Sequence, residues 1–155
     1  MTEIYNGISV RSASLPDLER LVPLFDAYRV FYRQPSDPEG AARFLSERLG
    51  QLQSVVLLAE EPESGEAAGF TQLYPTFSSV SMKRSWILND LYVSESFRGR
   101  RVGGMLLDAA RQHAELTGAK GIALSTAPEN VTAQKLYEGR GYRRDDEYLN
   151  YFLTL

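Results

Sequence analysis

One stretch of the sequence constrains the fold more than any other. An apolar segment ending at Val93 runs into a loop rich in glycine and arginine, and apolar residues at helical spacing begin at Val102. The loop contains Arg98, Gly99, Arg100, Arg101, Gly103 and Gly104. This pattern predicts a strand, a tight loop and a helix over 102–117, followed by a strand at 122–126 and a helix at 131–138. A strand–helix–strand crossover of this kind joins parallel strands.

The first half of the chain has a different order of elements. Apolar segments at 8–13, 55–59, 68–74 and 85–93 predict four strands, of which 55–59 is a continuous apolar run typical of a strand buried on both faces. Two helices are expected between the first two strands. The chain is therefore predicted to be mixed α/β, with hairpins early and a parallel crossover late, and residues 1–155 are expected to form one domain.

The sequence also predicts finer features of the helices and of the C-terminal tail. Pro23 predicts a kink or short break in the first helix, because proline lacks the N–H that a helix interior needs. The second helix is expected to end near Leu52, with Phe44 and Leu52 directed inward, and Phe31 is assigned to the core. Residues 142–153 are predicted to form two strands around an acidic turn, leaving an apolar edge strand at 149–153.

Composition excludes several classes of site. The chain has no cysteine and a single histidine, His113, which excludes disulfides, a cysteine nucleophile and a multi-histidine metal site, so no metal is expected. The net charge of -3 argues against nucleic-acid binding. No apolar run approaches the roughly 20 residues that span a bilayer, and the N-terminus lacks the features of a signal peptide. A cytoplasmic protein that binds no membrane is expected.

The glycine–arginine loop is suited to a phosphate ligand. The first N–H groups of a helix have no internal acceptor and lie at its positive end, and glycines let a ligand approach the backbone. The loop is not a Walker A motif, and its glycine spacing does not match a dinucleotide fingerprint. A glycine-rich turn with solvated arginines is the structural alternative.

A second motif lies downstream. Asn130 can cap the helix at 131–138, and Ala133, Leu136 and Tyr137 share one face of it. The phenol of Tyr137, with an ordinary pKa near 10, is a suitable acid for a thiolate leaving group.

Together the two motifs resemble the GNAT superfamily of acetyl-CoA-dependent N-acetyltransferases. The pyrophosphate motif of that family, Gln/Arg-x-x-Gly-x-Gly/Ala, corresponds to residues 98–103, and its later motif, Asn-x-x-Ala-x-x-Leu-Tyr-x-x-x-Gly-Phe/Tyr, corresponds to residues 130–142. Arg101 departs from the family pattern, which usually has glycine there. The backbone N–H remains, so phosphate binding should survive if the local φ suits a non-glycine residue. The resemblance implies a mixed, mostly antiparallel sheet of six to seven strands, with a splayed parallel pair and about four helices.

The resemblance also implies roles for individual residues. Acetyl-CoA would be the cosubstrate, bound by the strand before the loop, by the loop, and by two residues of the later motif. These cofactor-binding residues would be Leu91, Tyr92, Val93, Arg98, Gly99, Arg100, Arg101, Val102, Gly103, Gly104, Asn130 and Tyr137. Direct attack by an amine on the thioester needs no enzyme nucleophile, and Tyr137 would act as general acid.

Asp90 is the candidate base. An alkyl ammonium with a pKa near 10.4 costs roughly 4–5 kcal/mol to deprotonate at neutral pH. The segment Leu88–Val93 resembles the Leu-Glu-Asp-aromatic-aromatic-Val stretch of diamine acetyltransferases, with Asn89 in place of the glutamate. The alternative is that Asp90 binds a backbone N–H at a bulge or pairs with an arginine. Strand alternation groups Asp90 with Trp86, Leu88 and Tyr92, but a bulge would reset the faces.

The amine acceptor is less constrained. Tyr28, Tyr32 and Asp37 lie where the family builds its acceptor wall, and with Asp90 they are the candidate substrate-binding residues. The predicted function is transfer of acetyl from acetyl-CoA to a primary amine of a small cationic molecule or a peptide lysine. The alternatives are a non-catalytic acetyl-CoA-binding sensor or regulatory module, and a nucleotide-binding regulator. The apolar terminal strand predicts a homodimer.

Overall fold

The computed structural model describes residues 3–155. The chain forms two compact units, the first ending at Ser125 and the second comprising Thr126–Leu155. The first unit contains a six-stranded sheet in the order β1-β2-β3-β4-β5-β6. Its strands are β1 (Ile4–Tyr5), β2 (Ile8–Ser12), β3 (Val55–Glu61), β4 (Glu66–Ser78), β5 (Lys83–Val93) and β6 (Ile122–Ala123). All neighbouring strands are antiparallel except β5 and β6, which are parallel. The predicted mixed, mostly antiparallel sheet is confirmed.

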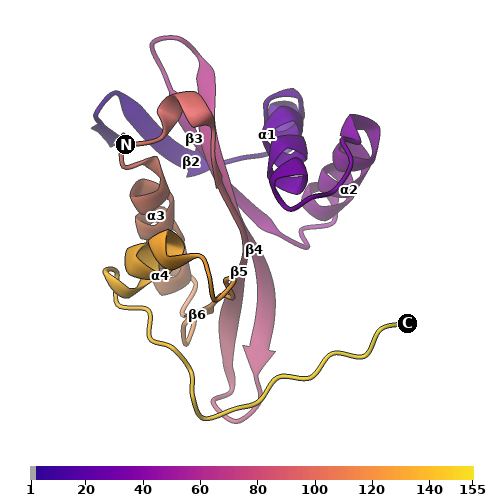
Figure 1. Cartoon of the computed structure of the whole chain (residues 1–155), viewed down its shortest axis with the longest axis vertical. Coiled ribbons are helices and arrows are strands. Elements are labelled where there is room, and N and C mark those ends of the chain that lie inside the picture. Colours follow the sequence, from indigo (N-terminus) through magenta and orange to yellow (C-terminus); the bar gives the residue numbers. More distant parts are fainter. Residues whose placement is uncertain (1–2) are drawn as a thin grey trace. The chain divides into compact units, whose positions relative to one another are not determined.

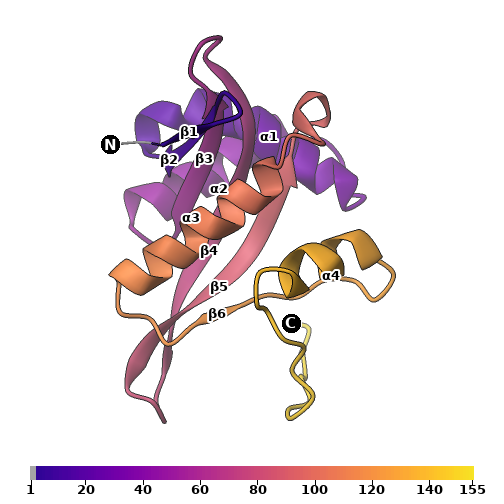
Figure 2. The same cartoon turned by 90° about the vertical axis from the view of Figure 1, so that its left-hand side faces the viewer.

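Three helices of the first unit cover the two faces of this sheet. Helices α1 (Leu18–Phe31) and α2 (Pro38–Gly50) lie on one face, and α3 (Val102–Leu116) lies on the other (Figures 1 and 2). Short 3₁₀ turns at Leu15–Asp17 and Glu95–Phe97 precede α1 and α3. The second unit contains α4 (Val131–Glu138), the fourth helix of residues 3–155.

The core explains why these segments form these elements. Residues 56–59 of β3 are all buried, because α1 and α2 cover one face of this strand and α3 covers the other. Leu21, Leu24 and Phe25 of α1, at helical spacing, pack with Ala41 and Leu45 of α2. The prediction of a strand buried on both faces is confirmed.

Several finer expectations are wrong. Helix α1 continues through Pro23 without a break, although proline there removes the intrahelical hydrogen bond to the carbonyl of Glu19. Phe31 is 61% exposed, and Leu52 is 87% exposed beyond the end of α2, where its φ of 53° lies in the left-handed region. Phe44 is only partly covered, stacking on Phe25 at 5.8 Å between ring centroids.

The C-terminal tail also differs from its prediction. Residues 139–155 contain neither a helix nor a strand, so the two predicted strands are absent, and the side chains of residues 148–155 are largely exposed. Apolar alternation alone does not make a strand, because an isolated strand leaves its backbone hydrogen bonds unpaired.

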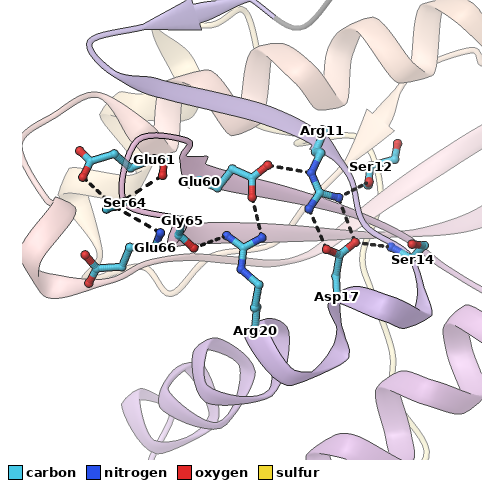
Figure 3. A network of polar contacts seen from close by, with 10 residues as sticks. All are labelled: Arg11, Ser12, Ser14, Asp17, Arg20, Glu60, Glu61, Ser64, Gly65 and Glu66. Carbon is cyan, nitrogen blue, oxygen red and sulfur yellow. Dashed lines mark hydrogen bonds and ion pairs between the residues drawn. The ribbon is translucent and has the colours of Figure 1, made fainter.

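A network of ion pairs joins the start of α1, at Asp17 and Arg20, to strands β2 and β3 (Figure 3). Arg11 on β2 donates two hydrogen bonds to the carboxylate of Asp17, at 2.9 and 2.7 Å, and a third to Glu60 on β3 at 2.7 Å. Arg20 on α1 donates to the other Glu60 oxygen at 2.6 Å. The network fixes the direction in which α1 leaves β2.

We expect Asp17→Asn to lower the free energy of unfolding by about 1–2 kcal/mol at pH 7, since Arg11 is partly exposed and water screens the pair. The hydrogen bonds from Arg11 lower the pKa of Asp17 to about 2. Its stabilisation is therefore present above its unfolded pKa, near 4, and is lost as the pH falls through about 2. Urea unfolding from pH 7 to pH 2 should show the two proteins converging at acid pH. A constant difference, or an equal effect of the exposed change Glu63→Gln, would contradict this assignment.

None of the helices described over residues 3–155 has the length and apolar character that a membrane crossing requires.

Candidate active site

The parallel pair β5–β6 is joined over a very short length. Only Trp86–Ile122 and Ile87–Ala123 pair, whereas β5 pairs with β4 from Lys83 to Val93. Beyond Ile87, the edge of β5 that points away from β4 therefore has no strand partner within the first unit. The predicted pantetheine segment Leu91–Val93 lies on this unpaired edge. The strand expected at 122–126 is shortened to Ile122–Ala123.

The loop that follows β5 leads into α3 through a left-handed residue. Arg101 has φ 63° and ψ 20° and is the N-cap residue of α3. This is the conformation that glycine adopts most easily, so Arg101 keeps the backbone path of the family's usual glycine at a cost of about 1–2 kcal/mol. Gly99 is also left-handed, with φ 80°.

The first amides of α3 are available for a ligand. Within residues 3–155, no side chain caps them, and the first turn contains no acidic residue. The N–H groups of Val102, Gly103 and Gly104 also lack intrahelical acceptors by helix geometry. They lie at the positive end of a 15-residue helix, which suits a diphosphate.

The arginine side chains of the loop have other partners. Arg100 donates to Glu61 at 2.8 Å and to the carbonyl of Asn6, and its hydrogen bond lowers the pKa of Glu61. Arg101 approaches the Tyr5 hydroxyl, and Arg98 donates to the carbonyl of Val93 at 3.2 Å. All three arginines are predicted phosphate ligands, but Arg100 is bound to Glu61 of β3. The backbone amides therefore remain the main candidate phosphate ligands.

We expect Arg101→Gly to stabilise the protein by about 0.5–1 kcal/mol, because glycine relieves the left-handed strain. Arg98 provides a matched control, since its φ of -67° is ordinary and Arg98→Gly should destabilise by about 0.5–1 kcal/mol. Urea unfolding of the two variants should give shifts of opposite sign. Shifts of the same sign would show that the conformation of Arg101 is not strained.

A β-bulge controls the direction of Asp90. Gln72 pairs with Asp90, but the next residue of β4, Leu73, pairs with Leu88, so Asn89 is an extra residue on β5. Adjacent residues of β4 point to opposite faces, and Asp90 and Leu88 therefore do too. The bulge separates Asp90 from Trp86 and Leu88 and turns it toward α1 and α2. The bulge considered in the sequence is therefore present, and the grouping of Asp90 with Trp86 and Leu88 by strand alternation is wrong.

Asp90 lies in a buried polar cluster. It is 3% exposed, and its carboxylate accepts hydrogen bonds from the side-chain amides of Gln72 and Asn89. Burial raises the pKa of Asp90, and hydrogen bonds from Gln72, Asn89 and Tyr28 oppose that shift. Neither a backbone amide nor an arginine is among the described partners of the carboxylate. A carboxyl group with a raised pKa is suited to accepting a proton near neutral pH.

Two tyrosines complete this cluster. Tyr28 of α1 donates to the carbonyl of Asn89 at 3.3 Å, and burial together with the charge of Asp90 raises the pKa of Tyr28. Tyr74 of β4 lies two residues beyond Gln72 on the same face, and burial and Asp90 raise its pKa to about 12. Both phenols therefore stay protonated at neutral pH.

The other predicted acceptor residues have different surroundings. Tyr32 is exposed and packs against Tyr28, with ring centroids 5.0 Å apart. Asp37 is the N-cap of α2, accepting a hydrogen bond from Gly40 at 2.9 Å. An open pocket of about 340 Å³ is lined by residues of α1, the start of β4 and the end of β5, including Tyr92, but neither Tyr32 nor Asp37 lines it.

The later motif belongs to the second unit. Asn130 accepts a hydrogen bond from the Ala133 amide at 3.2 Å and so caps α4, as predicted. The ring of Tyr137 in the last turn of α4 lies 5.9 Å from that of Tyr142.

Sequence reasoning missed Gln72, Tyr74, Arg48 and Ser54, which lie on the same side of the sheet as Asp90. A polar residue within the apolar segment 68–74 was the available signal for Gln72. His113 packs against Trp86 on the opposite face, at 5.0 Å between ring centroids, which fits its predicted place at the edge of the core.

The geometry above agrees with the comparisons with known proteins. The model of the acetyltransferase (GNAT) family matches residues 21–142. The chain belongs to the GNAT family of acetyltransferases. It is 49% identical over 148 residues to the uncharacterized N-acetyltransferase YhfO of Bacillus subtilis, covering 96% of this chain and 98% of that relative.

Two further relatives within the family are informative. The D-amino-acid N-acetyltransferase HPA3 of Saccharomyces cerevisiae is 29% identical over 146 residues, covering 92% of this chain and 89% of that protein. A crystal structure of a probable acetyltransferase matches with a TM-score of 0.89 and 46% identity, covering 94% of this chain and 97% of that one. The GNAT fold is therefore shared over nearly the whole chain.

Proposed function

We propose that this GNAT protein transfers acetyl from acetyl-CoA to a primary amine by direct attack. The observation that carries the proposal is one arrangement within the first unit. Uncapped amides at the start of α3 adjoin the unpaired edge of β5, and the same strand carries a buried carboxylate, Asp90. One segment thus combines a diphosphate site, an extended edge for an amide-bearing arm, and a base.

The residues present fit acetyl-CoA, which would supply a thioester carbonyl for the reaction. The amides of Val102, Gly103 and Gly104 would bind the diphosphate, helped by the backbone of Gly99 and Arg101. The backbone of Leu91–Val93 would hydrogen-bond the pantetheine arm as an added strand. Arg98 and Arg100 would contribute positive charge near the diphosphate rather than direct ligation.

Asp90 would accept the proton that the attacking amine must lose. Burial of Asp90 favours the neutral carboxylic acid that this transfer produces. The raised pKa of Asp90 therefore lies closer to the pKa of the ammonium group that must lose the proton. Tyr28 would hold the carboxylate in place. The proton leaves the amine nitrogen for a carboxylate oxygen of Asp90, directly or through one water.

Tyr137 is the proposed general acid, which would donate its phenolic proton to the departing sulfur. We expect Tyr137→Phe to lower kcat roughly 10–1000-fold with little change in the KM for acetyl-CoA, because only the phenolic hydroxyl is removed. Steady-state kinetics with Tyr148→Phe, an exposed tyrosine of the tail, provides the control. An unchanged kcat would exclude Tyr137 from the mechanism.

The same proposal covers the organisation of the protein. We infer that both units act as one acetyltransferase domain, since the family match of residues 21–142 extends over both. A homodimer is proposed on the exposed apolar side chains of the tail, such as Phe152, which is 92% exposed. Light scattering after size exclusion would distinguish a dimer from a monomer.

Two measurements test the proposed function. Thermal unfolding should shift upward with acetyl-CoA and not with ATP or GTP, which separates the proposal from a nucleotide-binding regulator. Thiol release should then be measured with polyamines, amino acids, aminoglycosides and lysine peptides as acceptors. Amino acids are included because one relative is named for D-amino acids, and the other amines represent different acceptor classes. Stabilisation without thiol release for any amine would favour a non-catalytic sensor.

A further inference from the structure

Three buried polar atoms on the α1–α2 side of the sheet have no partner among residues 3–155. They are Arg48 Nε on α2, Ser54 Oγ just before β3, and Gln72 Oε1 on β4. Buried polar atoms in folded proteins nearly always have a hydrogen-bond partner, which can be protein, water or a ligand. Three such atoms on one side of the sheet make it a candidate site for a polar ligand.

Strand register brings Ser54 and Gln72 into one neighbourhood. Val56 pairs with Gln72 and Val55 with Leu73, so continuing the register by one residue sets Ser54 opposite Tyr74. Tyr74 and Gln72 share a face and lie about 7 Å apart along β4. Gln72 is fully buried and donates its amide hydrogen to Asp90, which leaves its carbonyl oxygen free to accept.

Arg48 approaches the same neighbourhood from α2. The carbonyl of Arg48 accepts a hydrogen bond at 2.8 Å from the amide of Gln53, the neighbour of Ser54, and its guanidinium carbon lies 4.7 Å from the centroid of Phe44. The charge of Arg48 lowers the pKa of Tyr74, while burial and Asp90 raise it, so Tyr74 is within electrostatic reach of both charged groups. Among residues 3–155, the guanidinium of Arg48 forms an ion pair with the exposed side chain of Glu47, its neighbour in sequence.

The cluster thus has two chemically different ends. Arg48 Nε and the Ser54 hydroxyl are hydrogen-bond donors, whereas Gln72 Oε1 and the carboxylate of Asp90 are acceptors. Donors next to a guanidinium suit a carboxylate, and acceptors next to a carboxylate suit an amine. We propose that the acceptor is a free amino acid, whose carboxylate is bound by Arg48 and Ser54 and whose amine is held by Gln72 and Asp90.

This inference rests on the proposed function and narrows its acceptor. A polyamine would need a second carboxylate, but Asp26 and Asp37 on this side of the sheet are already engaged. Asp26 accepts hydrogen bonds from Ser36 and from the Asp37 amide, and Asp37 caps α2. A guanidinium near the base also repels a second cationic group. An acceptor with its own carboxylate uses Arg48 instead.

The test compares matched acceptors, each an amino acid and the amine that lacks its carboxylate. Both enantiomers of phenylalanine are compared with phenethylamine, and both enantiomers of leucine with 3-methylbutylamine. Wild-type protein should give a kcat/KM at least about 10-fold higher for one enantiomer of each amino acid than for the matched amine. Arg48→Gln should raise the KM for the amino acid about 10–100-fold, the range for losing charge-assisted hydrogen bonds, and change the values for the amine less than about 3-fold. Arg48→Lys should restore part of the loss.

Arg43→Gln is the matched control, because Arg43 is exposed on the same helix and should leave both acceptors unchanged. If Arg48→Gln does not fold, two other measurements test the inference. One is the wild-type comparison above, and the other is Ser54→Ala, which should raise the KM for the amino acid and not for the amine. A preference for the amine without a carboxylate, or an equal loss for both acceptors, would overturn the inference while leaving the N-acetyltransferase proposal intact.

Calorimetric titration of phenylalanine or leucine into the protein with CoA gives a readout that does not depend on turnover. If the protein binds the amino acid and Arg48→Gln weakens that binding, the inference is supported. If the same protein acetylates no amine, the proposed catalysis is wrong. If the protein neither binds nor acetylates these amino acids, the inference is overturned.

Discussion

Replacing Gly103 with glutamate is expected to weaken acetyl-CoA binding at least about 100-fold. Gly103 is the second residue of α3, where its N–H points out of the helix without an intrahelical acceptor. A glutamate would bring a negative charge and three extra side-chain carbons toward the proposed diphosphate position. Like charges a few ångströms apart at a protein surface repel by several kcal/mol at an effective dielectric near 20, which corresponds to a 100-fold loss or more.

The same variant should fold at least as well as the wild-type protein. An acidic residue in the first turn of a helix interacts favourably with the helix dipole, by about 0.3–1 kcal/mol. Calorimetric titration with acetyl-CoA, paired with thermal unfolding of the free protein, would separate lost binding from lost stability. Gly50→Glu makes the same charge change at the end of α2, where a Cβ would meet no neighbouring atom within 4 Å, and should bind normally. Unchanged affinity in Gly103→Glu would refute the diphosphate position.

Asp90→Asn is expected to lower kcat by about 10²–10⁴-fold, the usual range for removing a general base. The rising limb of the pH–rate profile should disappear with it, since that limb would report the ionisation of Asp90. Asp145→Asn, in the exposed tail, should leave both the rate and the limb unchanged. An unaltered profile in Asp90→Asn would mean that solvent deprotonates the amine and that Asp90 has a structural role.

Stability provides an independent check on the same variant. Burial raises the pKa of Asp90 in the folded state, so ionisation costs stability as the pH rises from the unfolded pKa, near 4, through the higher folded value. Asparagine does not ionise and avoids this loss. Gln72 can rotate its amide so that its unpartnered oxygen accepts from the new side chain. Urea unfolding at pH 8 should therefore show Asp90→Asn to be at least as stable as the wild-type protein.

Local features of the chain were the ones that sequence reasoning predicted well. The boundaries of α4 and the start of α3 at Val102 agree with their prediction, because glycine, proline and asparagine limit the backbone locally. The tail failed for the opposite reason. Alternation in residues 142–153 satisfies the pattern of a strand, but pairing depends on a neighbouring strand that the pattern does not specify.

The conformation of Arg101 lies between these cases. Its motif position indicated a glycine-like backbone, and its side chain argued against one. The structure nevertheless holds Arg101 at a left-handed φ of 63°, in the loop between β5 and α3. The preference of arginine for a right-handed or extended backbone, worth about 1–2 kcal/mol, is therefore outweighed by the tertiary structure.

The sequence by itself determined the family of the chain and the position of its glycine–arginine loop, because a helix start with unpaired amides depends only on residues close together in the chain. The tertiary structure alone decided the surroundings of Asp90. The bulge at Asn89 turns Asp90 toward α1, and strand register brings Ser54 and Gln72 together from segments 18 residues apart. Register depends on the summed packing and hydrogen bonding of whole strands, and one extra residue reverses every side chain beyond it.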